Sequence, residues 1–292
     1  MPLRFRLAIS CLLAALTFGP VHAQPLQAGQ PPGNELLFAI NARGELLRFR
    51  AGKPNVILTR KKIAGLDEDV RGMDFRVSHG ALFVLGASGR LYTLDTDTAQ
   101  ATALGEAPLA LPAVETGFDF NPTVDRMRVT LADGTNLRAH PVTGAQVDSD
   151  PKADGVQRDG ALVYAPNDPH AGWPALISGV AYTYNQKNDK LTTNFAIDGA
   201  RGTLVTMGSR EGVEPVVSPN GGQVFTVGTL KTGPLTGVSF DISDVHNSAY
   251  LAASRVGDTR THLFRVDLDS GKATYLASIG KKERIRALAI EP

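Results

Sequence analysis

Gly72-Met73-Asp74-Phe75 is a four-residue motif, the repeated phrase, that recurs along the chain with small changes. Each copy opens a stretch of short apolar strands separated by turn residues, without the apolar periodicity of a helix. Repeated units of several strands predict an all-β fold of the β-propeller type. The other copies are Gly117-Phe118-Asp119-Phe120, Gly179-Val180-Ala181-Tyr182, Gly237-Val238-Ser239-Phe240 and Ala287-Leu288-Ala289-Ile290.

Two units show the layout of one propeller blade most clearly. Each has four short apolar runs joined by turn-type sequences such as Ala87-Ser88-Gly89 and Asp269-Ser270-Gly271. We therefore predict a four-stranded meander in each unit. The predicted strands are residues 72–76, 81–85, 90–95 and 100–104 in one unit, and 237–242, 249–253, 262–267 and 273–279 in the other.

The two ends of the chain predict how the ring closes. The last copy of the phrase is followed only by the chain end, so it supplies one strand and no blade. The N-terminal part has three predicted strands, at residues 36–40, 45–50 and 56–61, but no copy of the phrase. Pairing the C-terminal strand with these three completes a fifth blade and removes the open sheet edges that invite aggregation.

The middle of the chain is less regular. Residues 148–174 contain five aspartates among glycines and prolines, with one apolar run, Ala161-Leu162-Val163-Tyr164. That run fits an outer strand of the third blade or the first strand of an additional blade. Five blades are favoured and six are the alternative. A long functional loop also explains the segment.

The first residues have the form of a secretory signal peptide. Arg4 and Arg6 precede an apolar run at residues 7–18, and Val21-His22-Ala23 predicts cleavage after Ala23. The run is shorter than the roughly 20 apolar residues that cross a bilayer. Residues 24–34 are rich in Pro, Gly and Gln and are expected to form a flexible leader. The sequence thus predicts a periplasmic or secreted protein with no membrane span after signal removal.

Composition excludes several classes of site. The only cysteine, Cys11, leaves with the signal, so the mature chain has no disulfide, thiolate metal site or cysteine nucleophile. The formal net charge is +1 and the signs are interspersed. Without a basic stripe, nucleic acid is not an expected partner. We expect a monomeric single domain at residues 35–292.

The chain resembles a known family at residues 117–129, 136–138, 159–164, 168–174 and 181–185. The family is that of the secreted bacterial proteins grouped as domain of unknown function 4394. The resemblance covers nearly the whole mature chain and implies an exported, propeller-like protein with no established activity. It supplies no catalytic residue.

Asp74 and Asp119 occupy one position of the repeated phrase, where the other copies have Ala181, Ser239 and Ala289. Two carboxylates facing a central funnel are the groups that a glycosidase uses as acid and as base or nucleophile. The preferred interpretation is structural: the two aspartates accept backbone N–H bonds between blades, because buried carboxylates need partners.

The densest polar cluster follows the second copy of the phrase. Asn121 and Asp125 fit a turn between strands, and Arg126 and Arg128 share one face of the next strand. Arg138 on the following strand could join them to bind a carboxylate or phosphate. A structural salt-bridge network with Asp119 or Asp125 is the preferred alternative.

The acidic stretches fit calcium poorly. Residues 95–97 and 267–271 lack the further oxygens that calcium needs and fit ordinary hairpin turns better. The segment from Asp148 to Asp168 is a slightly better candidate for calcium, and no other cofactor is expected. The only tryptophan, Trp173, lies beside it and suits sugar or peptide contact, although a packed lid residue is preferred.

No nucleophile elbow, phosphate loop or metal-spaced histidine pattern is present in the sequence. We therefore predict a non-enzymatic binding or scaffolding module for a small molecule, a glycan or a protein partner. The expected ligand-binding candidates are Asn121, Asp125, Arg126, Arg128, Arg138, Asp168 and Trp173. The alternative is a glycan-acting hydrolase or lyase that uses Asp74 and Asp119.

Overall fold

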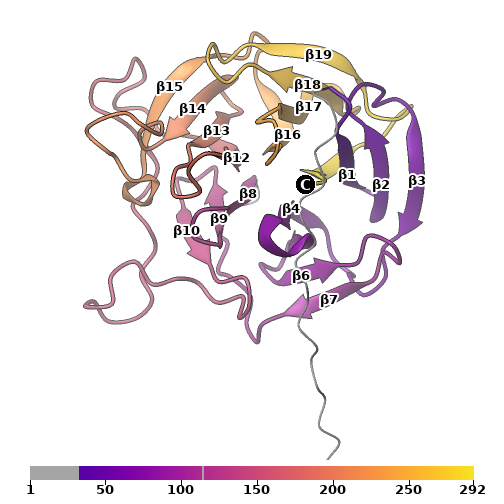
Figure 1. The fold of residues 1–292 in the computed structure, drawn as a ribbon, viewed down its shortest axis with the longest axis horizontal. Helices are drawn as coiled ribbons and strands as arrows, with labels where there is room; N and C mark the ends of the chain where they lie inside the picture. The colour runs from indigo at the N-terminus through magenta and orange to yellow at the C-terminus, as the bar shows by residue number, and fades with distance from the viewer. Residues whose placement is uncertain (1–32, 114) are drawn as a thin grey trace, which may run out of the picture.

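A computed structural model describes residues 33–113 and 115–292. Its strands form five sheets arranged around a central axis, so the fold is a five-bladed β-propeller (Figure 1). Beyond the strands, the described residues contain two short 3-10 helices, Val77–His79 and Pro219–Gly221. The predicted signal peptide and nearly all of the predicted leader lie outside the described residues, and they stay predictions.

The five blades follow one another along the chain. Blade 1 contains β20 (Ile285–Ile290), β1 (Leu36–Asn41), β2 (Glu45–Arg50) and β3 (Ile57–Lys62). Blade 2 contains β4 (Val70–Arg76), β5 (Ala81–Gly86), β6 (Leu91–Leu94) and β7 (Ala101–Leu104). Blade 3 contains β8 (Thr116–Asn121), β9 (Arg126–Leu131) and β10 (Asn136–Ala139). Blade 4 contains β12 (Ile177–Tyr182), β13 (Asn194–Asp198), β14 (Thr203–Met207), β15 (Gln223–Thr229) and β11 (Val163–Tyr164). Blade 5 contains β16 (Leu235–Ile242), β17 (Ala249–Arg255), β18 (His262–Val266) and β19 (Ala273–Ser278).

The predicted closure of the ring is confirmed. The C-terminal strand β20 pairs antiparallel with β1, with Ala39 opposite Leu288 and Leu37 opposite Ile290. Figure 1 shows the yellow end of the chain beside the indigo start. Most strands lie within one or two residues of their predicted places because the turn residues mark the ends of each meander.

The irregular middle segment does not form a sixth blade. Its short strand β11 pairs in parallel with β15, at the outer edge of the sheet that opens near Gly179. Blade 3 has three strands, and its outer edge is followed by a bridge between Ala139 and Gln146. Residues 140–162 thus run as a long loop beside the third blade.

Apolar packing lies between neighbouring blades, which explains why the inner strands are apolar on both faces. Phe38 of blade 1 meets Phe75 of blade 2 edge-on at 5.6 Å, and Phe83 of blade 2 meets Phe120 of blade 3 at 5.0 Å. All six residues of β1 are buried, whereas the outermost strand β3 is mostly exposed.

Two glycines of the repeated phrase, Gly72 and Gly117, lie where neighbouring inner strands pack closely together. A Cβ atom on Gly72 would lie 2.3 Å from Cβ of Phe118 in the next blade. A Cβ atom on Gly117 would lie 2.9 Å from the backbone nitrogen of Val180. Both distances are shorter than real Cβ contacts, so these two positions require glycine for close packing between blades.

Candidate functional site

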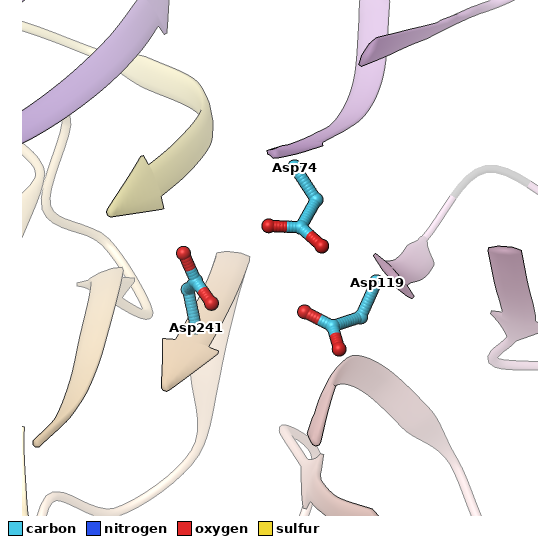
Figure 2. A group of neighbouring side chains, drawn as sticks. All are labelled: Asp74, Asp119 and Asp241. Carbon is cyan, nitrogen blue, oxygen red and sulfur yellow. The ribbon is translucent and has the colours of Figure 1, made fainter. Parts of the chain in front are cut away.

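Three aspartates converge on the axis of the propeller. Asp74 lies on β4, Asp119 on β8 and Asp241 on β16, the innermost strands of blades 2, 3 and 5. One carboxylate oxygen from each lies within 4.8 Å of the others, and Figure 2 shows the three side chains pointing toward one another. All three residues are buried. We call this set the axial triad.

Asp241, and not Ser239, is the counterpart of Asp74 in blade 5, so the predicted alignment of the fourth copy is wrong by two residues. Asp241 binds the backbone in the same way as Asp74, with one oxygen on its own neighbour and one on the next blade. Ser239 takes the place of Gly72. The sequence carried a signal for this in Phe240-Asp241-Ile242, which repeats the apolar-Asp-apolar pattern of Met73-Asp74-Phe75.

The alignment failed because it was anchored on glycine. Strand β16 has an irregularity between Thr236 and Ser239, which displaces Gly237 from the close-packed position. Gly237 has a positive φ of 57° and open space around the place of a Cβ atom. Gly237 therefore allows the strand to bend at the irregularity and takes no part in the contact between blades. The residue type was repeated, but its role was not.

The axial triad binds one amide from every inner strand. Asp74 accepts from Phe75 and Phe120 at 2.7 Å each, and Asp119 accepts from Tyr182 at 2.9 Å. Asp241 accepts from Ile242 and Ile290 at 2.6 Å each. Blades 4 and 1 have Ala181 and Ala289 at this position, so the neighbouring aspartates bind the amides that those blades leave open. This is the backbone role that the sequence favoured for Asp74 and Asp119.

One carboxylate oxygen of the triad remains. Three carboxylates have six oxygens, and five of them accept the five amides. Within the described residues, Asp119 Oδ1 accepts no hydrogen bond, although Asp119 is only 4% exposed. The site therefore has one carboxylate oxygen that accepts no amide, beside two further carboxylates.

The charge of the triad is poorly compensated. Burial raises the pKa of Asp74 and Asp119 well above the ordinary range, and repulsion between the aspartates raises it further. Burial also raises the pKa of Asp241 to about 7. Asp244, on the loop after β16, adds to the repulsion. Across residues 33–113 and 115–292, no Lys, Arg or His forms an ion pair with the triad.

The turn residues after β8 serve the backbone and a neighbouring blade. Asn121 accepts from the amide of Thr123 at 2.9 Å, which is the predicted turn. Asp125 forms a two-pronged ion pair with Arg76 of blade 2, with Nε to Oδ1 at 2.8 Å. Arg126 donates to nearby backbone carbonyls. These contacts give the three candidates structural roles.

Arg128 and Arg138 meet, but on a buried carboxylate instead of an open site. Arg128 is 1% exposed and donates to Asp159 Oδ2 at 2.6 Å, and Arg138 donates to the same carboxylate at 2.8 Å. Arg128 also binds the side chains of Tyr182, Asn136 and Asn220. A salt-bridge network was the preferred expectation, but its acid is Asp159 and not Asp119 or Asp125.

Asp168 and Trp173 lie apart from the triad. Asp168 accepts from the amides of Thr226 and His170 at 2.6 and 2.8 Å, so it fixes a turn against β15. Trp173 is 64% exposed, and the guanidinium of Arg201 lies 5.6 Å from the centre of its ring. The expectation of a packed lid residue is wrong for Trp173. The predicted candidates are thus dispersed and do not form one site.

A chain of hydrogen bonds that the sequence did not suggest joins Asp258, His262 and Ser278. His262 lies 2.9 Å from Asp258 Oδ2 and 3.0 Å from Ser278 Oγ, through its two ring nitrogens. Arg260 also binds Asp258 and, with His262, lowers its pKa. Ser278 lies on the outermost strand of its blade and pairs directly with His262. This chain of hydrogen bonds links strands β18 and β19 through the side chains of His262 and Ser278.

The family described as "Domain of unknown function (DUF4394)" matches residues 45–289. The chain belongs to this family. Among the described residues, no helix is long and apolar enough to span a membrane.

Two other comparisons add little to the DUF4394 assignment. No curated protein matches the chain. Among solved structures, the chain is similar to the β-propeller domain of Cps50 (Swd1) from Myceliophteria thermophila, at 11% identity and a TM-score of 0.42. That similarity covers 84% of this chain and 68% of the other.

Proposed function

We propose that this member of the DUF4394 family is a non-enzymatic binding module whose axial triad holds a divalent cation, preferably calcium. The observation that supports the proposal is the uncompensated negative charge at the axis of the propeller. Three buried carboxylates share five amide donors and no cationic side chain of the described residues, and Asp119 Oδ1 stays free.

Buried like charges at this separation need compensation. A carboxylate taken out of water is strongly destabilised unless it is paired, coordinated or protonated. The triad therefore carries either shared protons or a cation. Carboxylate oxygens are hard ligands that suit calcium and magnesium. Calcium tolerates variable geometry and takes six to eight oxygens, so three carboxylates with water would suit it better than magnesium, which demands an octahedron.

The glycosidase alternative has less support. A hydrolase needs its two carboxyl groups in an open funnel, one able to protonate a leaving group and the other free to act as base or nucleophile. Asp74 and Asp119 are 7% and 4% exposed, and both bind backbone amides of neighbouring strands. Their oxygens hold the ring together, which leaves a substrate little access to them.

Calcium titration of chelator-treated protein tests the proposal. We expect calcium to raise the melting temperature at neutral pH and magnesium to raise it less, since a ligand that binds only the folded state stabilises that state. Asp119→Asn should abolish the calcium response but keep an acceptor for the amide of Tyr182. The matched control is Asp154→Asn, an exposed aspartate of the long loop.

Two results would count against the cation. One is a wild-type protein that shows neither a calcium-dependent shift in melting temperature nor heat of binding at neutral pH. In that case bound protons, and not a cation, neutralise the negative charge of the three carboxylates. The other is an equal calcium response in Asp119→Asn and the wild type, which would place the ion elsewhere.

A further inference from the structure

A second site lies at the mouth of the propeller where all five inner strands begin. A cavity of about 410 Å³ is lined there by the first residues of β4, β8, β12, β16 and β20. Arg71 and Arg286 are among them, and each lies three residues before the triad position of its strand. At about 3.3 Å per residue, the cavity and the triad are about 10 Å apart along the axis.

Bulges place side chains at this mouth. In β4, β12 and β20 the pairing with the second strand skips one residue, and the skipped residues are Arg71, Ser178 and Arg286. In β16 the pairing skips residues 237 and 238. All of these residues line the cavity. Bulges re-aim side chains and are frequent beside binding sites, and four of five inner strands have one at the same level.

The two bulged arginines have unused donors. A guanidinium has five N–H donors. Within the described part of the chain, Arg71 uses one, to the carbonyl of Ala113, and Arg286 has only a long 3.5 Å ion pair with the exposed Asp69. The Nε atoms of both are buried without a partner. Such donors are costly unless an acceptor arrives.

We propose that this mouth cavity binds a small hydroxylated organic carboxylate, with Arg71 and Arg286 receiving the carboxylate. The two arginines are on neighbouring strands at equivalent positions, an arrangement that suits a planar two-oxygen anion. Ser178, Ser254 and Thr236 add hydroxyl groups to the lining. The site is independent of the cation at the triad.

The acids of the cavity favour a single negative charge over a phosphate dianion. Asp258 is already paired with Arg260 and His262. Glu115 has no ion pair among the described residues, and burial raises its pKa. Asp69 and Glu115 are therefore the remaining acids, and Arg71, Arg284 and Arg286 are the cations. One carboxylate therefore neutralises the net positive charge of the lining, whereas a dianion leaves an uncompensated negative charge in the cavity.

A matched pair of probes tests the inference. Galacturonate and galactose differ in the carboxylate, so we expect galacturonate and gluconate to bind by calorimetry and galactose not to bind. Arg71→Gln and Arg286→Gln should each weaken galacturonate binding by about tenfold or more, because each removes charge-assisted hydrogen bonds. The control is Arg265→Gln, an exposed arginine on β18. Circular dichroism of each variant verifies the fold.

Three outcomes would overturn the inference. They are equal binding of galacturonate and galactose, no binding of either carboxylate, and equal affinity in the wild type and both cavity variants. Inorganic phosphate is run in parallel, and tighter binding of phosphate than of galacturonate would contradict the assigned chemistry. All titrations are repeated with Asp119→Asn in chelator, so that failure of the cation proposal does not affect the result.

Discussion

At the scale of single residues, the aspartates of the axial triad act as acceptors shared between blades. Each inner strand presents one amide to the axis, and the three aspartates bind all five amides. Ala181 and Ala289 lie at the same strand position without a carboxylate. Asp241 therefore binds both its own neighbour Ile242 and the closing strand at Ile290. Two copies of the repeat can therefore have alanine at the triad position, because an aspartate of a neighbouring blade accepts their amide.

Replacing Asp241 with alanine should lower the free energy of unfolding by about 2–4 kcal/mol, because two buried amides lose their acceptor. Asp241→Asn should lower it less, since the amide oxygen of asparagine can still accept and one buried charge is removed. Urea unfolding followed by circular dichroism measures both, with Asp154→Ala as the exposed control. Equal stability of the alanine and asparagine variants would show that the amide bonds do not stabilise the ring.

At the scale of elements, the long loop beside blade 3 is held by charge. Asp159 is buried and accepts from Arg128 on β9 and Arg138 on β10. Asn136 donates to the carbonyl of Gly160 at 3.1 Å, which fixes the same stretch of chain. With only three strands in blade 3, this network joins the loop to the outer part of the sheet. The acid-rich segment is thus a support for the blade.

Asp159→Ala should destabilise the protein by about 3–5 kcal/mol, because Arg128 then keeps a buried charge without its carboxylate. We also expect faster proteolysis within residues 148–162, whose attachment is lost. Urea unfolding and limited proteolysis measure the two effects. Asp154→Ala in the same loop is the control, and a similar small effect in both variants would contradict the structural role of Asp159.

At the scale of the whole molecule, a cluster of charges strengthens the ring where its ends meet. Asn41 and Arg60 of blade 1 both bind Glu45, at 2.7 and 2.5 Å. They also both bind Glu283, just before the closing strand, at 2.9 and 2.6 Å. Strand pairing and this cluster therefore connect the same two ends of the chain. Opening the ring breaks both.

Stability should fall in acid through this cluster. The hydrogen bond from Asn41, supported by Arg60 and Arg43, lowers the pKa of Glu45 from 4.5 to about 2. A lowered folded-state pKa stabilises the protein above the unfolded value, and the benefit is lost as pH falls from about 4.5 to about 2. The wild type should exceed Glu45→Gln in urea midpoint at neutral pH, and the difference should vanish near pH 2. A difference that persists unchanged at pH 2 would contradict this.

Much of the architecture follows from local sequence. Turn residues end each strand, and apolar runs such as Ala81-Leu82-Phe83-Val84-Leu85 must be covered on both faces, so the repeat predicts blades that stack. The C-terminus has a single surplus strand and the N-terminal unit has only three strands, which predicts that the two pair to close the ring. These inferences succeed because strand length, turn chemistry and apolar pattern act over a few residues.

The candidate sites were less predictable, because they depend on how distant strands meet. Asp241 was missed because a bulge shifted the glycine by which the fourth copy was aligned. Arg71 and Arg286 were not suspected, since no local pattern marks an arginine that a bulge exposes at a shared mouth. Arg128 was suspected of binding a ligand, but Asp159, 31 residues further on, occupies it.

The sequence by itself determined that this protein is an all-β repeat protein. It has five copies of the phrase that begins an inner strand, and its two ends must pair to close the ring. Hydrogen bonding and burial along each strand depend on residues close together in the sequence, and all five copies of the repeat encode them. Only the tertiary structure decided which aspartates share the axis and which arginines share the mouth. The physical reason is that these groups come from different blades, and their spacing depends on strand register and bulges after the ring has closed.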